Sequence, residues 1–177
     1  MEGMRLSNKL LIVLMFLTLL LLFIIPANAD YSTINPIADA HIYSSSPDSN
    51  YGSSSTLYVG SSYKSLIKFD LSQYQNKEIA YARLKIKVSG GSNYADANIL
   101  FYRVTGSWNE SDVTWNNAPS YDNSTVIANI SISSVGTWYE VDLTDEVQYL
   151  VNNIDENHGW ILVWDSDLNG YVTIVSR

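Results

Sequence analysis

Cysteine is absent from the 177-residue chain. Disulfide bonds, thiol catalysis and cysteine-ligated zinc sites are therefore excluded. Histidine is nearly absent too, because His41 and His158 are the only two, and the chain has neither a nucleophile elbow nor a phosphate-binding loop. We therefore expect the protein not to be an enzyme.

Positive charge is scarce. The chain has 10 lysine and arginine residues against 18 aspartate and glutamate residues, and its formal net charge is −8. A protein with this balance repels polyanions, so nucleic acid and anionic lipid are excluded as expected partners. An acidic polysaccharide is a suitable ligand only if the few cations cluster or if a metal ion bridges the like charges.

One long apolar run is present, at the N-terminus. Arg5 and Lys9 make a basic start, residues 10–25 are almost entirely apolar, and Ala27-Asn28-Ala29 is a small-x-small cleavage pattern. This order predicts a secretory signal peptide that is cleaved near Ala29. The alternative is a retained membrane anchor, since a spanning helix needs about 17–25 apolar residues. We expect a secreted or cell-surface protein with no membrane segment beyond this leader.

Residues 30–177 carry the signals of a single β-rich domain. Short β-branched and aromatic segments alternate with turn signals about every ten residues. The expected strands are 37–43, 56–60, 65–71, 79–88, 97–105, 125–132, 136–143, 160–164 and 171–175. The last two are expected to form a hairpin around Asp165–Gly170, and Thr144 is expected to cap a short helix. The pattern predicts an all-β, antiparallel β-sandwich of the jelly-roll type with one short helix, preceded by the signal peptide of residues 1–29.

The segment 79–88 shows the cleanest alternation. Its even positions are apolar, and the odd positions from 81 to 87 are polar. A period of two predicts that the polar set faces solvent. Its basic and aromatic side chains suit the carboxylates and the apolar ring faces of an anionic polysaccharide. The candidate carbohydrate-binding residues are Tyr81, Arg83, Lys85 and Lys87, with Trp138 from a strand that we expect beside them. The alternative is an ordinary solvated face.

Two loops hold oxygen ligands of the kind that calcium prefers. The segment Asp165–Gly170 matches the first half of a calcium loop, although Ser176 replaces the glutamate of the twelfth position and strands flank the loop. The candidate structural Ca²⁺ sites are Asp39 with Asp48 and Asn50, and Asp165 with Asp167 and Asn169. The alternatives are a capped strand end for the first group and a plain hairpin turn for the second.

The most informative stretch runs from Trp108 to Pro119, with the sequence Trp-Asn-Glu-Ser-Asp-Val-Thr-Trp-Asn-Asn-Ala-Pro. It is too polar for a buried helix and too aromatic for a linker. We expect a long connection held against the sheet by two rings, each worth about 2–3 kcal/mol when buried. Weaker motifs lie in order around it: Ala38-Asp39-Ala40-His41-Ile42, Asn50-Tyr51-Gly52, Leu66–Leu71, Gly136–Thr144 and Ser176-Arg177.

Together these motifs resemble the DNRLRE-type domain, a group that includes carbohydrate-binding module family 96 and the disaggregatase-related repeats of methanogenic archaea. The resemblance covers essentially all of residues 30–177. It implies a secreted, non-catalytic β-sandwich that binds a cell-surface or matrix polysaccharide, here one that contains uronic acid. In that group Ser-Arg is usually followed by Glu and a last strand. We therefore expect a missing strand, and an open sheet edge that associates with itself or with a neighbouring surface-protein domain.

Two other interpretations stay open. A structural or adhesion domain of the cell envelope would use the same fold without a sugar site. A truncated fragment of a polysaccharide-degrading enzyme would need two carboxylates at a defined separation, and Glu110, Asp112, Glu140 and Asp142 are available. An exposed row of aromatic residues would favour binding, whereas carboxylates facing each other across a cleft would favour the enzyme.

Overall fold

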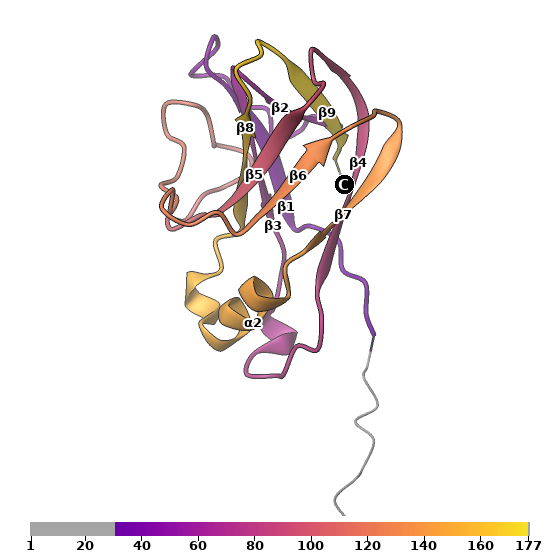
Figure 1. Ribbon diagram of the computed structural model, residues 1–177. Coiled ribbons are helices and arrows are strands. Elements are labelled where there is room, and N and C mark those ends of the chain that lie inside the picture. Colours follow the sequence, from indigo (N-terminus) through magenta and orange to yellow (C-terminus); the bar gives the residue numbers. More distant parts are fainter. Residues whose placement is uncertain (1–30, 177) are drawn as a thin grey trace, which may run out of the picture. The chain divides into compact units, whose positions relative to one another are not determined.

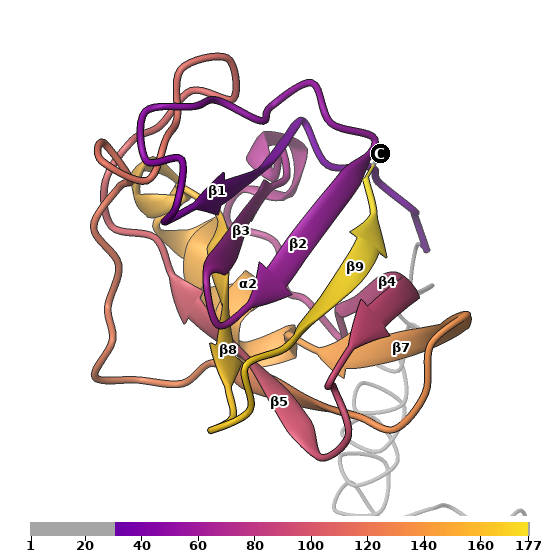
Figure 2. The same cartoon turned by 90° about the horizontal axis from the view of Figure 1, so that it is seen from above.

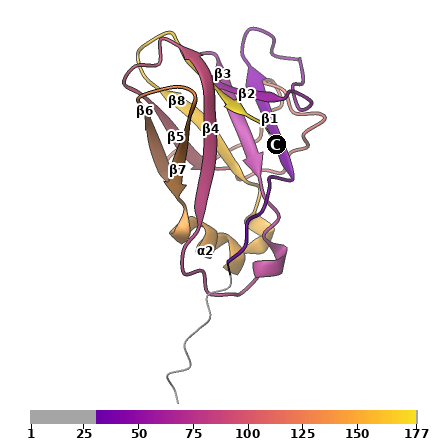
Figure 3. The ribbon, with the colours of Figure 1, turned by 90° about the vertical axis from the view of Figure 1, so that its right-hand side faces the viewer.

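The computed structural model describes residues 31–176, and nine strands make up the sandwich in this part of the chain (Figures 1 and 3). The strands are β1 (Ala38–Tyr43), β2 (Thr56–Gly60), β3 (Tyr63–Lys68), β4 (Arg83–Ser92), β5 (Ala97–Arg103), β6 (Ala128–Ile132), β7 (Thr137–Asp142), β8 (Trp160–Asp165) and β9 (Tyr171–Val175). Helix α2 (Thr144–Asn152) and two short 3₁₀ segments, Ser72–Tyr74 and Ile154–Glu156, complete the fold. The predicted leader lies outside the described residues.

The strand order has jelly-roll connectivity. One layer contains β1, β3, β8, β5 and β6, and the other contains β2, β9, β4 and β7. All paired strands are antiparallel, and the pair Gly60 and Tyr63 joins the layers through the β2–β3 turn (Figure 2). With β1 set aside as an added edge strand, β2 to β9 follow the order of two interlocked Greek keys. The predicted fold class is confirmed.

The predicted hairpin between the last two strands is wrong. β8 pairs with β3 and β5, whereas β9 pairs with β2 and β4. The loop between them therefore crosses from one layer to the other. Asp, Asn and Gly favour any tight connection, so the turn residues carried no information about which strands pair.

The main core lies between the two layers. Leu84, Ile86 and Val88 of β4 are buried, as the period of two predicts. Phe101 of β5 and Leu162 of β8 are fully buried in the same apolar cluster. Alternation along the strands therefore places one face of each layer in the core and leaves the other for further contacts.

Helix α2 packs one face on this core and buries Val147, Leu150 and Val151. The predicted cap at Thr144 is wrong. The Asp142 carboxylate accepts the Thr144 N–H at 2.9 Å, and Thr144 Oγ1 instead accepts the N–H of Ala82 at 3.0 Å. Thr144 is the first residue of the helix, Leu143 stands at the cap position before it, and no side chain caps the helix start. Within residues 31–176 no helix is long and apolar enough to cross a membrane.

A second apolar cluster lies under the connection 108–119, on the outer face of the β1–β3–β8 layer. Ile42, Leu66 and Ile161 are buried there, together with Val113 of the connection itself. Trp108 and Trp115 pack on this cluster, and Trp108 Nε1 donates to the carbonyl of His158 at 2.8 Å. The expectation of a connection held by its tryptophans is confirmed.

Glu110 joins this connection to the first strand and to the loop that follows it. Its Oε1 accepts the N–H of Asp39 at 2.8 Å, and its carbonyl accepts Asn50 Nδ2 at 2.8 Å. A Cβ atom at Gly52 would lie 2.0 Å from the same carbonyl oxygen, so only glycine permits this approach. The motifs that are separate in sequence therefore meet at Glu110.

Replacement of Asn50 should destabilise the fold. Asn50→Ala removes hydrogen bonds to the carbonyls of Glu110 and Val113, each 2.8 Å long, which should cost about 1–3 kcal/mol in total. The free energy of unfolding from urea denaturation measures this cost. Asn129→Ala, at an exposed position of β6, is the control. Equal stability of the two variants would contradict the role assigned to Asn50.

Candidate functional site

The predicted basic strip lies on the outer face of the β2–β9–β4–β7 layer. Its cations face the side chains of β7 across the sheet in the pairs Arg83–Asp142, Lys85–Glu140 and Lys87–Trp138. The Trp138 side chain is 62% exposed, so its ring is open to a ligand. Tyr81 precedes β4, is exposed, and lies 5.9 Å from the Arg83 guanidinium. The structure thus brings together the residues proposed from the sequence.

Glu140 offsets much of the positive charge of the strip. Its carboxylate lies 2.8 Å from Lys85 Nζ and 3.1 Å from an Arg83 guanidinium nitrogen. The hydrogen bond from Lys85, followed by that from Arg83, lowers the pKa of Glu140. Glu140 is therefore ionised at neutral pH. Both ion pairs are solvent-exposed, so they add little to stability and mainly weaken the local positive field.

Lys87 differs from the other two cations. It lies opposite Trp138, and it makes no ion pair with another residue of the described chain. An ammonium group beside an exposed indole can bind a carboxylate while the ring stacks on a sugar face. Lys87 and Trp138 therefore form the part of the strip best suited to a ligand.

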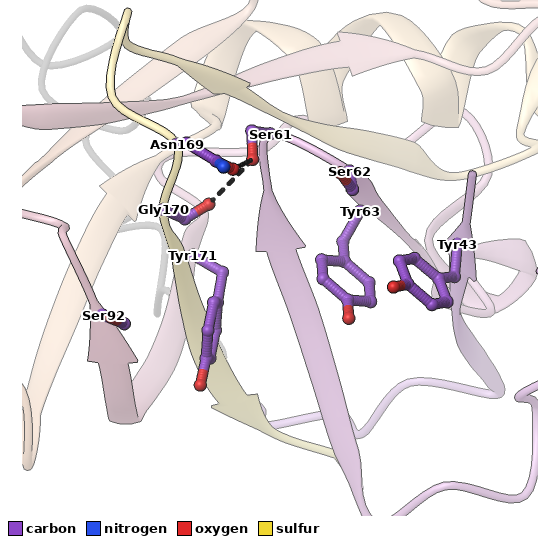
Figure 4. A pocket seen from close by; sticks show the side chains of 8 residues that line it. All are labelled: Tyr43, Ser61, Ser62, Tyr63, Ser92, Asn169, Gly170 and Tyr171. Atoms are coloured by element: carbon purple, nitrogen blue, oxygen red, sulfur yellow. Dashed lines mark hydrogen bonds between the residues drawn. The ribbon is translucent and has the colours of Figure 1, made fainter. Parts of the chain in front are cut away.

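A row of tyrosine rings lies beside the β2–β3 turn, where β1 ends and where β3 and β9 begin (Figure 4). Tyr43, Tyr63 and Tyr171 surround an open hollow of about 250 Å³. Tyr43 and Tyr63 stack with ring centroids 4.3 Å apart, and the ring of Tyr171 lies 6.3 Å from that of Tyr63. Sequence analysis missed this feature, because the three residues come from three distant segments.

Neutral polar groups complete the rim of the hollow. Ser61 donates to Asn169 Oδ1 at 2.7 Å, and Ser62 and Ser92 line the same space (Figure 4). Burial, and secondarily a hydrogen bond with Tyr43, raises the pKa of Tyr63 to about 12. Tyr63 therefore stays protonated at any physiological pH.

His41 lies beside these rings in the interior. It is 4% exposed, it stacks on Tyr51 with ring centroids 4.5 Å apart, and its ring centroid lies 5.0 Å from that of Tyr58. Burial lowers the pKa of His41, so the imidazole is neutral at pH 7. Its Nδ1 has no hydrogen-bond partner within the described chain. On the side of His41, the aromatic cluster is therefore backed by a neutral ring.

The residues of the first calcium candidate take part in hydrogen bonds within the fold. Asp48 Oδ1 accepts Asn116 Nδ2 at 2.7 Å, and Asp39 Oδ1 accepts the Ser176 hydroxyl at 2.7 Å. Asn50 binds the backbone of the connection described above.

The second calcium candidate begins at Asp165, the last residue of β8, and continues into the loop before β9. Asp165 and Asp167 are exposed there, while Asn169 lines the tyrosine hollow. Across residues 31–176, no group of three or more His, Cys, Asp or Glu side chains is placed to hold a metal ion. Calcium at either loop stays a prediction, and an unchanged unfolding temperature on calcium addition would contradict it.

Three of the four carboxylates considered for hydrolysis have partners within the fold. Glu110 binds the backbone of Asp39, Glu140 pairs with the strip, and Asp142 binds Thr144. Glu140 and Asp142 extend from the same face of β7. The site geometry offers aromatic faces and hydrogen-bond donors for binding.

Comparison with known proteins adds one finding. The family model described as carbohydrate-binding module family 96 matches residues 30–177. This range includes both the basic strip and the tyrosine row. No curated protein matches the chain.

Proposed function

The chain belongs to carbohydrate-binding module family 96, and from this premise we propose that it is a secreted, non-catalytic module that binds a polysaccharide containing uronic acid. Family membership supports carbohydrate binding, and the basic strip supports an acidic ligand. The closer resemblance to DNRLRE-type and disaggregatase-related domains forms part of the proposal, and it favours a cell-surface or matrix glycan. Association with a neighbouring domain, or with a second copy at a sheet edge, stays a prediction.

The pair of Lys87 and Trp138 is the observation that carries the proposal. An exposed indole on the outer face of a sheet can cover the C–H face of a sugar ring. Lys87, its neighbour across the strands, can then bind the carboxylate of that sugar or of the next one. Arg83 and Lys85 extend the positive surface along β4, although they share Glu140.

Removal of the charge or the ring should weaken binding to a uronic-acid polymer. Lys87→Ala should lower the affinity for alginate by up to about fivefold, the worth of one exposed ionic contact. Trp138→Ala should lower it by about tenfold, because an aromatic stacking surface is lost. Gel retardation in alginate or polygalacturonate, at two salt concentrations, measures both effects, and salt should weaken the ionic part.

Lys77→Ala is the matched control, because Lys77 is an exposed lysine outside the strip, in the loop before β4 where its carbonyl accepts Gln148 Nε2 of helix α2. It should migrate as the wild type does. Retardation of the wild type that neither Lys87→Ala nor Trp138→Ala changes would place the site elsewhere. Folded protein that no polysaccharide retards would favour the structural or adhesion domain.

Removal of the competing carboxylate should strengthen binding. Glu140→Gln keeps the side-chain shape but removes the negative charge that pairs with Arg83 and Lys85. We expect up to about fivefold tighter binding to alginate and little change in stability, since exposed ion pairs contribute about 0–1 kcal/mol. Unchanged or weaker binding in isothermal titration calorimetry would show that the ligand does not use these two cations. Glu78→Gln, a similar change at an exposed residue outside the strip, is the control.

The leader should direct export and then be removed. Residues 1–29 have the basic start, apolar run and small-residue site that signal peptidase requires. N-terminal sequencing of protein recovered from the cell exterior should therefore begin at Asp30. Protein that retains Met1 at the membrane would instead support the anchor interpretation.

A further inference from the structure

The three rings of the tyrosine row are partly buried and partly exposed, as aromatic residues that contact a ligand need to be. Tyr43, Tyr63 and Tyr171 are each half-buried: parts of their rings pack on neighbouring side chains and parts border the hollow (Figure 4). Held in this way, the rings lose little further conformational entropy when a ligand binds. Aromatic faces that are fixed in advance are suited to the C–H face of a sugar ring.

The polar groups around the hollow are hydrogen-bond formers without charge. The Asn169 side-chain oxygen already accepts from Ser61 at 2.7 Å, which leaves its NH₂ group for another acceptor. Neither that NH₂ group nor the Tyr171 hydroxyl bonds to another residue of the described chain. Neutral donors and acceptors of this kind match sugar hydroxyl groups.

The absence of charge in the described lining defines the ligand class. All eight lining residues are Tyr, Ser, Asn or Gly. A carboxylate placed among them would lose hydration without gaining a cation, which is costly. The hollow, at about 250 Å³, is also smaller than the pockets of roughly 300–1,000 Å³ that hold drug-sized ligands. It therefore suits a single uncharged sugar residue.

The hollow and the basic strip share one face of the sheet. On β4, Lys87 lies opposite Trp138, and Ser92 lies opposite Tyr171. Lys87 and Ser92 are five positions apart, which corresponds to about 16 Å at 3.3 Å per residue, slightly less across the bulge near Gly90. One sugar ring cannot reach both places, so different residues of one polymer would occupy them.

We propose that the tyrosine hollow is a second subsite, which binds an uncharged sugar residue while the strip binds an acidic one. This inference rests on the proposed carbohydrate-binding function and extends it to a polymer that contains both kinds of residue. Tyr171 and Tyr63 provide the stacking faces, and Asn169 and the Tyr171 hydroxyl provide hydrogen bonds. The bulge of β4 separates the two subsites.

Retardation gels with neutral polysaccharides test the subsite directly. The probes are dextran, laminarin, xylan, galactomannan and hydroxyethylcellulose, each run beside alginate with the full protein. At least one neutral polymer should retard the wild type, with no dependence on salt. Tyr171→Ala should weaken this binding by about tenfold through loss of the ring, and Lys77→Ala, outside both the strip and the hollow, should leave it unchanged.

A second variant guards against misfolding. Asn169→Ala changes an exposed loop residue and leaves all rings in place, and it should also weaken neutral binding. Tyr31→Ala, at a 73% exposed position outside the strands, is the tyrosine control and should behave as the wild type does. Near-ultraviolet circular dichroism confirms that each variant is folded.

The outcomes separate the two proposals. Neutral polymers that fail to retard folded wild-type protein, or that retard Tyr171→Ala and Asn169→Ala as strongly as the wild type, overturn the second subsite. Alginate retardation that depends on Lys87 would still support the strip in that case. Neutral retardation that depends on Tyr171, with no binding to alginate, would support the hollow and overturn the acidic ligand.

Discussion

The position of the 108–119 connection on the sandwich depends on one residue, Glu110. Its carboxylate holds the backbone of Asp39 at the start of β1, and its own carbonyl is held by Asn50. These contacts keep the 108–119 connection over the second apolar cluster, which would otherwise face water. They also fix β1, and β1 carries Tyr43 to the tyrosine hollow. The contacts of Glu110 under the connection therefore also help to position the tyrosine hollow.

The jelly roll explains how two different surfaces come to share one face. Because β9 lies between β2 and β4, its outward Tyr171 lies beside the end of β4. On the other side of β4, β7 pairs with the start of that strand. β4 is long enough to pair with β7 at its start and with β9 at its end. The bulge near Gly90 adds one residue to β4, so that Ser92 faces the same side of the sheet as Lys87. The basic strip therefore lies at the start of β4, and the neutral hollow lies at the end of the same strand.

Local periodicity predicted much of this fold but not its long-range pairing. The alternation in 79–88 was enough to predict which side chains of β4 face solvent, and the two tryptophans predicted the pinned connection. The salt bridges of Glu140 depend on the register between β4 and β7, which no local pattern contains. The hollow depends on Tyr43, Tyr63 and Tyr171 meeting from three strands, and each alone reads as an ordinary outward tyrosine on a strand. The mistaken hairpin has the same origin, because turn residues do not specify partners.

An acidic protein that binds an acidic polymer must overcome its own charge. The net charge of −8 acts at a distance, but salt screens it beyond about 8–10 Å at physiological ionic strength. At contact distance, Lys87 and Trp138 determine the interaction, since a carboxylate there meets an ammonium group beside an apolar ring. Glu140 limits how strongly Arg83 and Lys85 add to it. In the proposed complex, affinity therefore comes mainly from stacking and hydrogen bonding, and a few local charges determine which sugars are accepted.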